Sequence, residues 1–186
     1  MRIISGKLKG KKINFLKNLT TRPLKDSVKE NIFNILKHTN LNRVNIENAS
    51  ILDLYSGVGS FGLECISRGA KKVTFVEKDN NTIKILNENI TKFSIDHQAT
   101  LINDKIENAL LKINEVKYDI FFFDPPFLEK DYVKNLDLIK RKKIFNKKHI
   151  VIIHREKNTA DKIDNYVDAL TVKYYGRSKI IFAVFN

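Results

Sequence analysis

Short apolar runs and amphipathic stretches alternate along most of the chain. The apolar runs predict strands at Ile51–Tyr55, Lys72–Glu77, Thr100–Ile102, Tyr118–Asp124 and His149–His154. Apolar positions at helical spacing predict helices at Ser60–Arg68, Asn80–Phe93, Lys105–Ile113 and Tyr132–Lys142. Because strands and helices alternate, the pattern predicts an α/β fold with a doubly wound, mostly parallel seven-stranded sheet.

The two ends of the chain depart from this alternation. Arg2–Ser5 and Lys11–Phe15 flank a glycine turn and predict a small N-terminal β-hairpin. Ser27-Val28-Lys29-Glu30 matches a capping box that opens a helix. Leu170–Tyr175 and Ile180–Phe185 predict a C-terminal antiparallel hairpin. We expect one compact unit of 186 residues, in which a basic hairpin and helix (residues 1–48) precede the α/β domain (residues 49–186).

Positive charge is concentrated at the N-terminus. The chain has 34 Lys and Arg against 21 Asp and Glu, a formal net charge of +13. The first 25 residues contain no acid, which indicates a basic arm and a polyanionic partner, although a Lys-, Asn- and Ile-rich composition explains part of the excess. The candidate contacts with such a partner are Arg2, Lys7, Lys9, Arg22 and Lys25.

Composition also excludes several classes of protein. No apolar run approaches the roughly 20 residues of a membrane span, and the first residues lack the pattern of a secretory signal, so we expect a cytoplasmic protein. Cys65 is the single cysteine, with no Cys or His at metal-ligand spacing. We therefore expect neither a disulfide nor a metal, and we interpret Cys65 as a small buried apolar residue.

The first chemical motif follows the strand that begins at Ile51. Gly57, Gly59 and Gly62 form the pattern G-x-G-x-x-G, a turn whose backbone can approach a ligand closely. Asp53 lies four residues before Gly57, where its carboxylate would face an amine better than a pyrophosphate. The candidate cofactor-binding residues of this turn are Asp53, Tyr55, Ser56, Gly57 and Gly59.

Two further carboxylates follow the next strands. Glu77 ends a predicted strand 20 residues beyond Gly57, where a carboxylate can accept hydrogen bonds from both ribose hydroxyls. Asp104 follows the third strand and is a candidate for contacting the amino group of an adenine. An ordinary helix N-cap ahead of Ile106 is an equally good interpretation of Asp104.

Asp124-Pro125-Pro126-Phe127 follows the most apolar strand and is the candidate catalytic segment. Two prolines cannot continue a central strand, so the chain must turn outward at the carboxyl edge of the sheet. The Asp124 carboxylate and the Pro125 carbonyl can each accept an N–H, and Phe127 can stack on a base. The alternative is a strand-ending turn with a core aromatic. We interpret His154-Arg155-Glu156 as surface or core filler, because nothing pairs with His154 at catalytic spacing.

These motifs resemble those of class I methyltransferases, and the resemblance covers nearly the whole chain. The segments Met1–Gly6, Thr21–Asn34, Gly62–Ala70, Val76–Asp79 and Tyr175–Ser178 are similar to the bacterial 16S ribosomal RNA guanine-N2 methyltransferases. The resemblance implies that Asp53, Gly57, Gly59 and Glu77 hold S-adenosylmethionine. It also implies that Asp124–Phe127 hold the guanine and that Thr21-Arg22-Pro23 faces RNA. Phe61 and Arg177-Ser178 depart from the family pattern.

The implied activity is methyl transfer from S-adenosylmethionine to the N2 amine of a guanine in 16S ribosomal RNA. The implied partner is the small subunit or its assembly intermediate, and we expect a monomer. Four alternatives stay open: an adenine-N6 DNA methyltransferase, a protein glutamine methyltransferase, a nicotinamide dehydrogenase, and an RNA-binding assembly factor without activity. The first lacks the length for a target-recognition domain, the second normally has Asn where this chain has Asp124, and the third leaves the Asp-Pro-Pro-Phe turn unused.

Overall fold

The computed structural model describes residues 1–15, 24–39 and 44–186, and its centre is one seven-stranded sheet of order β3-β2-β1-β4-β5-β7-β6. The strands are β1 Ser50–Leu54, β2 Lys72–Glu77, β3 Ala99–Asn103, β4 Tyr118–Phe123, β5 Phe145–Glu156, β6 Val167–Tyr175 and β7 Ser178–Phe185. The first five strands pair in parallel, and β7 pairs antiparallel with both β5 and β6. The predicted fold class is confirmed.

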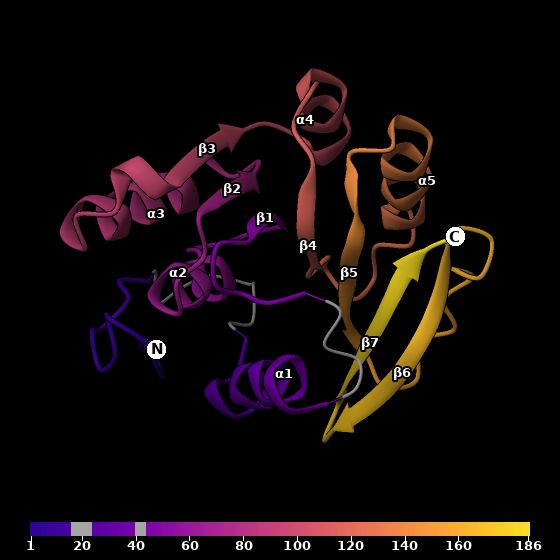
Figure 1. Cartoon of the computed structure of the whole chain (residues 1–186), viewed down its shortest axis with the longest axis horizontal. Helices are drawn as coiled ribbons and strands as arrows, with labels where there is room; N and C mark the ends of the chain where they lie inside the picture. The colour runs from indigo at the N-terminus through magenta and orange to yellow at the C-terminus, as the bar shows by residue number, and fades with distance from the viewer. Residues whose placement is uncertain (16–23, 40–43) are drawn as a thin grey trace.

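Helices cover both faces of the sheet (Figure 1). They are α1 Asp26–His38, α2 Ser60–Ser67, α3 Asn80–Lys92, α4 Ile106–Lys112 and α5 Tyr132–Lys142, with a 3-10 turn at Asp96–Gln98. Buried side chains of α1, α2 and α3 share one core cluster with Ile120 and Phe122 of β4, whereas those of α4 and α5 share the other with Phe121 and Phe123. In the described ranges no helix combines the length and apolarity that crossing a bilayer requires.

The order of the strands reverses between β1 and β4, and this point marks the expected ligand site. From β1 the chain proceeds outward to β2 and β3, then returns to β4 on the other side of β1 and continues to β5. Such a reversal separates the loops that follow the two central strands and leaves a crevice at their carboxyl ends, where open α/β sheets bind ligands. The turn that begins at Tyr55 and the segment that begins at Asp124 are these two loops.

The predicted N-terminal hairpin is only partly right. Its two arms meet at a single antiparallel bridge between Arg2 and Lys12, without regular strands. The loop is instead anchored on α2, because the backbone N–H groups of Ile4 and Ser5 donate to the Glu64 carboxylate at 2.7 and 2.9 Å. The two arms also exchange backbone hydrogen bonds, from Ile3 N to the Lys11 carbonyl and from Ile13 N to the Met1 carbonyl, so the contacts with Glu64 add to this pairing.

The predicted capping box is wrong. Helix α1 begins at Asp26 with Lys25 as its N-cap, and no side chain caps it. Ser27 therefore lies inside the first turn, where its carbonyl accepts a bond from the side chain of Asn31. Asp26 supplies the negative charge that favours a helix N-terminus.

Candidate active site

Two carboxylates from neighbouring strands hold the glycine turn after β1. Gly57 and Gly59 have φ of 55° and 86°, which favour glycine, and Gly59 is the N-cap of α2. Asp53 Oδ2 accepts the backbone N–H of Gly62 at 3.0 Å, and Glu77 Oε2 accepts that of Gly57 at 3.0 Å. The sequence-predicted residues of this site are thus brought together, with carboxylates fixing the backbone as well as facing the crevice.

The turn contains buried polar atoms that the described protein does not satisfy. Asp53 is 1% exposed and Ser56 is 8% exposed. Among the described residues, Asp53 Oδ1 and Ser56 Oγ have no hydrogen-bond partner. Burial raises the pKa of the Asp53 carboxyl well above its usual range; the Gly62 N–H opposes this shift, and the nearby charges of Asp124 and Glu77 add to it. A cationic ligand here would relieve both the desolvated charge and the unpaired oxygen.

Tyr55 connects the glycine turn to the segment after β4. Its backbone is left-handed, with φ of 60°. The hydroxyl donates to Glu129 Oε1 at 2.6 Å and accepts a bond from Asn135 Nδ2 at 3.0 Å. Burial, together with the Glu129 carboxylate, raises the pKa of Tyr55, so the hydroxyl keeps its proton at neutral pH. The Tyr55 hydroxyl is engaged between the two loops, and only the rest of the residue is left to contact a cofactor.

Asp104 is not the N-cap of α4. That position belongs to Lys105, which makes no side-chain cap. Asp104 Oδ1 accepts bonds from Lys105 N and Asn108 Nδ2, while Oδ2 accepts from Lys112 Nζ at 2.7 Å. Hydrogen bonds from Lys112 and then Asn108 lower the pKa of Asp104 to about 2. Helix α4 begins at Ile106, one residue later than it would if Asp104 were its N-cap, so the Asp104 carboxylate lies beside the helix.

The Asp-Pro-Pro-Phe segment begins beside β1. The backbone N–H of Asp124 donates to the Leu54 carbonyl at 3.4 Å. Asp124 Oδ1 lies 2.8 Å from His154 Nδ1, and no donor among the described residues bonds to its Oδ2 or to the Pro125 carbonyl. Phe127 is half-buried, and its ring meets the edge of His154 at a centroid distance of 5.6 Å. The acceptors that an amine would need are therefore available here.

The prediction that nothing pairs with His154 is wrong, because it pairs with Asp124, and the contacts of Arg155 with the same loop were not predicted. Arg155 is 1% exposed, and its guanidinium donates to the carbonyls of Pro126, Phe127 and Glu129 at 2.9 to 3.0 Å. Nε donates to Asp161 Oδ1 at 2.9 Å. The charged residues at the end of this apolar strand do not predict such contacts from the sequence, because the acceptors are backbone carbonyls about 28 residues away.

The chain is similar to known proteins over most of its length. A family model described as Conserved hypothetical protein 95 matches residues 1–184. Ribosomal RNA small subunit methyltransferase D of Buchnera aphidicola subsp. Acyrthosiphon pisum is 34% identical over 155 residues, 83% of this chain and 78% of that protein. The protein of the same name from Haemophilus influenzae is 37% identical over 129 residues, 68% of this chain and 64% of that protein. The chain belongs to the small-subunit ribosomal RNA methyltransferase family.

Solved structures show that the family fold extends over the whole chain. Escherichia coli yhhF, described as a candidate methyltransferase, superposes with a TM-score of 0.83 at 23% identity, covering 98% of this chain and 96% of its own. A candidate methylase of Haemophilus influenzae gives 0.79 at 27% identity and the same coverage. SMU.776, a candidate methyltransferase complexed with SAH, gives 0.61 at 16% identity over 77% of this chain and 47% of its own. The first and third comparisons establish the fold alone.

The departures from the family pattern have structural explanations. Phe61 is 2% exposed and stacks between Phe33 and Phe122, with centroid distances of 5.3 and 4.0 Å, so it belongs to the core under α2. Ser178 Oγ lies 2.9 Å from His154 Nε2. Arg177 is exposed and pairs with Glu156 at 2.8 Å. Ser178 is thus part of the site, whereas Phe61 and Arg177 are not.

Of the predicted RNA contacts, Arg2, Lys7 and Lys9 lie on the N-terminal loop, and Lys25 is the N-cap of α1. Arg2, Lys9 and Lys25 are exposed, and Lys7 Nζ donates to Gln98 Oε1 at 2.7 Å. Arg22, with Thr21 and Pro23, lies outside the described residues. Sequence reasoning missed Leu128, which directly follows Phe127 and is 94% exposed. No periodicity distinguishes it, because it lies in a loop.

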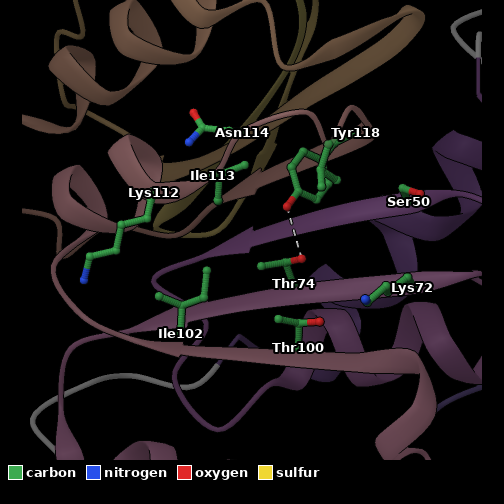
Figure 2. A pocket seen from close by; sticks show the side chains of 10 residues that line it. Ser50, Lys72, Thr74, Thr100, Ile102, Lys112, Ile113, Asn114 and Tyr118 are labelled. Atoms are coloured by element: carbon green, nitrogen blue, oxygen red, sulfur yellow. Dashed lines mark hydrogen bonds between the residues drawn. The ribbon is translucent and has the colours of Figure 1, made fainter.

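A separate cavity of about 230 Å³ lies at the amino end of the strands (Figure 2). Its lining includes Ser50, Lys72 and Tyr118, each the first residue of its strand. The Tyr118 hydroxyl points across the cavity and donates to Thr74 Oγ1 at 3.1 Å (Figure 2). None of the predicted catalytic or cofactor-binding residues lines this cavity. This cavity is therefore distinct from the candidate active site at the carboxyl edge.

Proposed function

We propose that this protein transfers the methyl group of S-adenosylmethionine to the N2 amine of a guanine in 16S ribosomal RNA of the small subunit. The observation that supports this most is the hydrogen bond from Asp124 N to the Leu54 carbonyl, because it joins the amine-binding segment to the strand that carries the glycine turn. Relatives named as small-subunit ribosomal RNA methyltransferases support the substrate class. The SAH complex of a protein with this fold supports the cofactor.

The residues of the glycine turn fit S-adenosylmethionine. The unpaired Asp53 Oδ1 is a partner for the cofactor's ammonium group, and Ser56 Oγ can bond to one of its polar groups. A Cβ built on Gly57 would meet nothing within 4 Å, so the backbone there is open to a ligand. Both Glu77 oxygens already accept backbone N–H bonds, and each retains a lone pair for a ribose hydroxyl. Asp104 has a lone pair left for the adenine amino group.

Asp124 and Pro125 would position the guanine amine. When bound, S-adenosylmethionine supplies an electrophilic methyl group. The guanine N2 lone pair is delocalised into the ring, so the enzyme must favour a geometry that directs it outward. Asp124 Oδ2 and the Pro125 carbonyl can each accept one N–H of the amine, while Phe127 stacks on the ring. The methylated nitrogen is strongly acidic, and Asp124 or water can take its proton.

The RNA would cover the carboxyl edge and the N-terminal loop. Arg2, Lys9 and Lys25 are exposed cations that can contact phosphates. Leu128 has an apolar side chain that is 94% exposed on the loop that holds the base. Apolar side chains are inserted between bases where proteins unstack nucleic acids, and a base that undergoes chemistry must leave its stack. We therefore assign Leu128 a contact with a base beside the target.

The deciding experiment measures transfer of labelled methyl from S-adenosylmethionine to small subunits from a strain that lacks this gene. Nucleoside analysis of the product should find N2-methylguanosine. Subunits from the parent strain, already modified, are the control. Transfer to DNA or to a protein instead would support one of the alternatives, and tight cofactor binding without transfer to subunits or naked RNA would refute the proposed substrate.

A further inference from the structure

Three side chains form a hydrogen-bonded row from the Asp-Pro-Pro-Phe segment into the C-terminal hairpin. Asp124 Oδ1 lies 2.8 Å from His154 Nδ1, and His154 Nε2 lies 2.9 Å from Ser178 Oγ. His154 belongs to β5 and is 7% exposed, while Ser178 is the first residue of β7. The antiparallel pairing of β5 with β7 brings the two strands together at this end of the sheet.

The chemistry of the carboxylate fixes which atom donates in the first bond. The Asp124 carboxylate can only accept, so His154 Nδ1 carries a proton and donates it. In the neutral imidazole Nε2 is then an acceptor, and the Ser178 hydroxyl donates to it. The Asp124 carboxylate thereby selects the Nδ1–H tautomer of His154, and the bond to Ser178 fixes the position of the far side of the ring.

We propose that His154, whose ring Ser178 holds in place, is a positioning residue for methyl transfer. This inference rests on the proposed function. The bond from Nδ1 occupies Asp124 Oδ1 and fixes the carboxylate plane, which leaves Oδ2 to accept the guanine amine. The same ring meets Phe127 nearly edge-on, at 84° between the ring planes. One imidazole therefore orients both the hydrogen-bonding and the stacking side chain of the base site.

The surrounding charges support this role. The adjacent Arg155 fixes the loop backbone through Pro126, Phe127 and Glu129, so the loop is held on one side by His154 and on the other by Arg155. Ser, His and Asp also make the triad of many hydrolases, where Asp orients His and His activates Ser. Here the carboxylate belongs to the proposed base-binding motif. Ser178 therefore orients His154, and His154 in turn orients Asp124.

Replacing His154 by Phe tests the proposal, because Phe keeps the ring and its contact with Phe127 but removes both hydrogen bonds. We expect kcat to fall about 10- to 100-fold, the loss of one hydrogen bond to a charged group. The KM for subunits and the Kd for cofactor should stay within about twofold, since neither ligand loses a direct contact. His154→Asn keeps an N–H donor near the position of Nδ1 and should recover part of kcat. His97→Phe, at an exposed position before β3, is the matched control and should behave as wild type.

Two further measurements separate positioning from a merely structural role. In an Asp124→Ala background, His154→Phe should change kcat little, because the group that it positions is gone. Long-range ¹⁵N–¹H spectra of the imidazole should show the Nδ1–H tautomer in the wild type and lose it in Asp124→Ala. Ser178→Ala should lower kcat less than His154→Phe, and Ser178→Thr should restore it.

The outcomes are distinguishable from failure of the proposed function. If the wild type makes no N2-methylguanosine, the proposed function fails, and the tautomer measurement still tests the row of hydrogen bonds. An Nε2–H tautomer, or a His154→Phe variant with wild-type kcat, would overturn the positioning role. Equal losses of kcat, cofactor affinity and melting temperature in His154→Phe would also overturn it, because such losses indicate general unfolding.

Discussion

The loop after β1 and the loop after β4 face the same crevice but are built in opposite ways. In the first, Asp53 Oδ1 and Ser56 Oγ are buried without partners among the described residues. In the second, residues of β5 bond to the Asp124 carboxylate and to three backbone carbonyls. An unsatisfied buried polar group costs about 1 to 3 kcal/mol, whereas a held loop loses little freedom when it binds. The first loop thus leaves buried groups that a ligand could satisfy, and the second is organised in advance by the protein.

This difference matches what each loop must do. Under the proposed function, the loop after β1 has only to bind the cofactor, so its unpaired groups can be satisfied by that ligand. The loop after β4 would have to hold an amine in a reactive geometry, and small displacements of a reacting group are costly to the rate. Tyr55 joins the two loops through Glu129 and Asn135, so that a change in one can reach the other.

The largest effect should come from removing the Asp124 carboxylate in the loop after β4. We expect Asp124→Ala to lower kcat by about 100-fold or more, because it removes both the amine acceptor and the nearest proton acceptor. Affinity for the cofactor should stay near that of the wild type, since Asp124 lies on the other loop. Single-turnover methyl transfer and calorimetric titration of S-adenosylmethionine measure the two quantities.

Asp131→Ala is the matched control for that variant. Asp131 is 71% exposed and pairs only with Lys134 among the described residues, so its removal should leave transfer unchanged. Full activity in Asp124→Ala would show that the Asp-Pro-Pro-Phe segment is a strand-ending turn and no more.

The sequence predicted the elements and motifs of the two loops better than it predicted the residues of β5 that hold the second loop. Strands, helices and the glycine turn follow from local periodicity and spacing, and strand β2 and helix α5 were predicted to the residue. Asp53 and Asp124 follow from motifs at strand ends. The organising residues do not: His154 and Arg155 act on groups about 30 positions away, and only the order of strands brings them together. The capping box at Ser27 failed because helix α1 begins before that residue, with Lys25 as its N-cap.

Arg155 provides the second test, on stability. Arg155→Met keeps much of the volume but removes the bonds to three carbonyls and leaves the buried Asp161 with fewer partners. We expect the free energy of unfolding to fall by about 3 to 5 kcal/mol, the cost of breaking a buried ion pair from one side. Denaturation in urea measures it.

The exposed Arg177 is the control for this change. It pairs with Glu156 while 73% of its side chain is exposed, so Arg177→Met should cost about 1 kcal/mol or less. Arg155→Lys should fall between the two, because an ammonium keeps the charge but lacks the planar fork. Equal losses for Arg155→Met and Arg177→Met would mean that β5 does not hold the loop.

A smaller effect is expected from a substitution beside the loop after β1, where the affinity for the cofactor should change. Glu77→Gln replaces a carboxylate that accepts the N–H groups of Gly57 and Asp79. We expect the Kd for S-adenosylmethionine to rise about 10- to 100-fold, through lost bonds to a charged acceptor. Calorimetric titration is the measurement, with Glu47→Gln, an exposed change before β1, as the control. An unchanged Kd would remove Glu77 from the cofactor site.

The smallest effect concerns the pH dependence of stability at Asp53. Burial raises the pKa of this carboxyl, so the folded state keeps its proton at pH values where the unfolded chain, near its ordinary value of about 4, has lost it. The folded protein therefore binds more protons, and the contribution of Asp53 to stability decreases as pH rises from about 4 towards the folded pKa. Asp53→Asn cannot titrate, so without cofactor its melting temperature should gain on that of the wild type as pH increases. A gain of about 2 to 4 °C corresponds to each kcal/mol in a chain of this size. Adding S-adenosylmethionine should make the wild type the more stable protein, because only the carboxylate can pair with the ammonium group of the cofactor. A difference in melting temperature that stays constant with pH would show that the pKa of Asp53 is not raised in the folded protein.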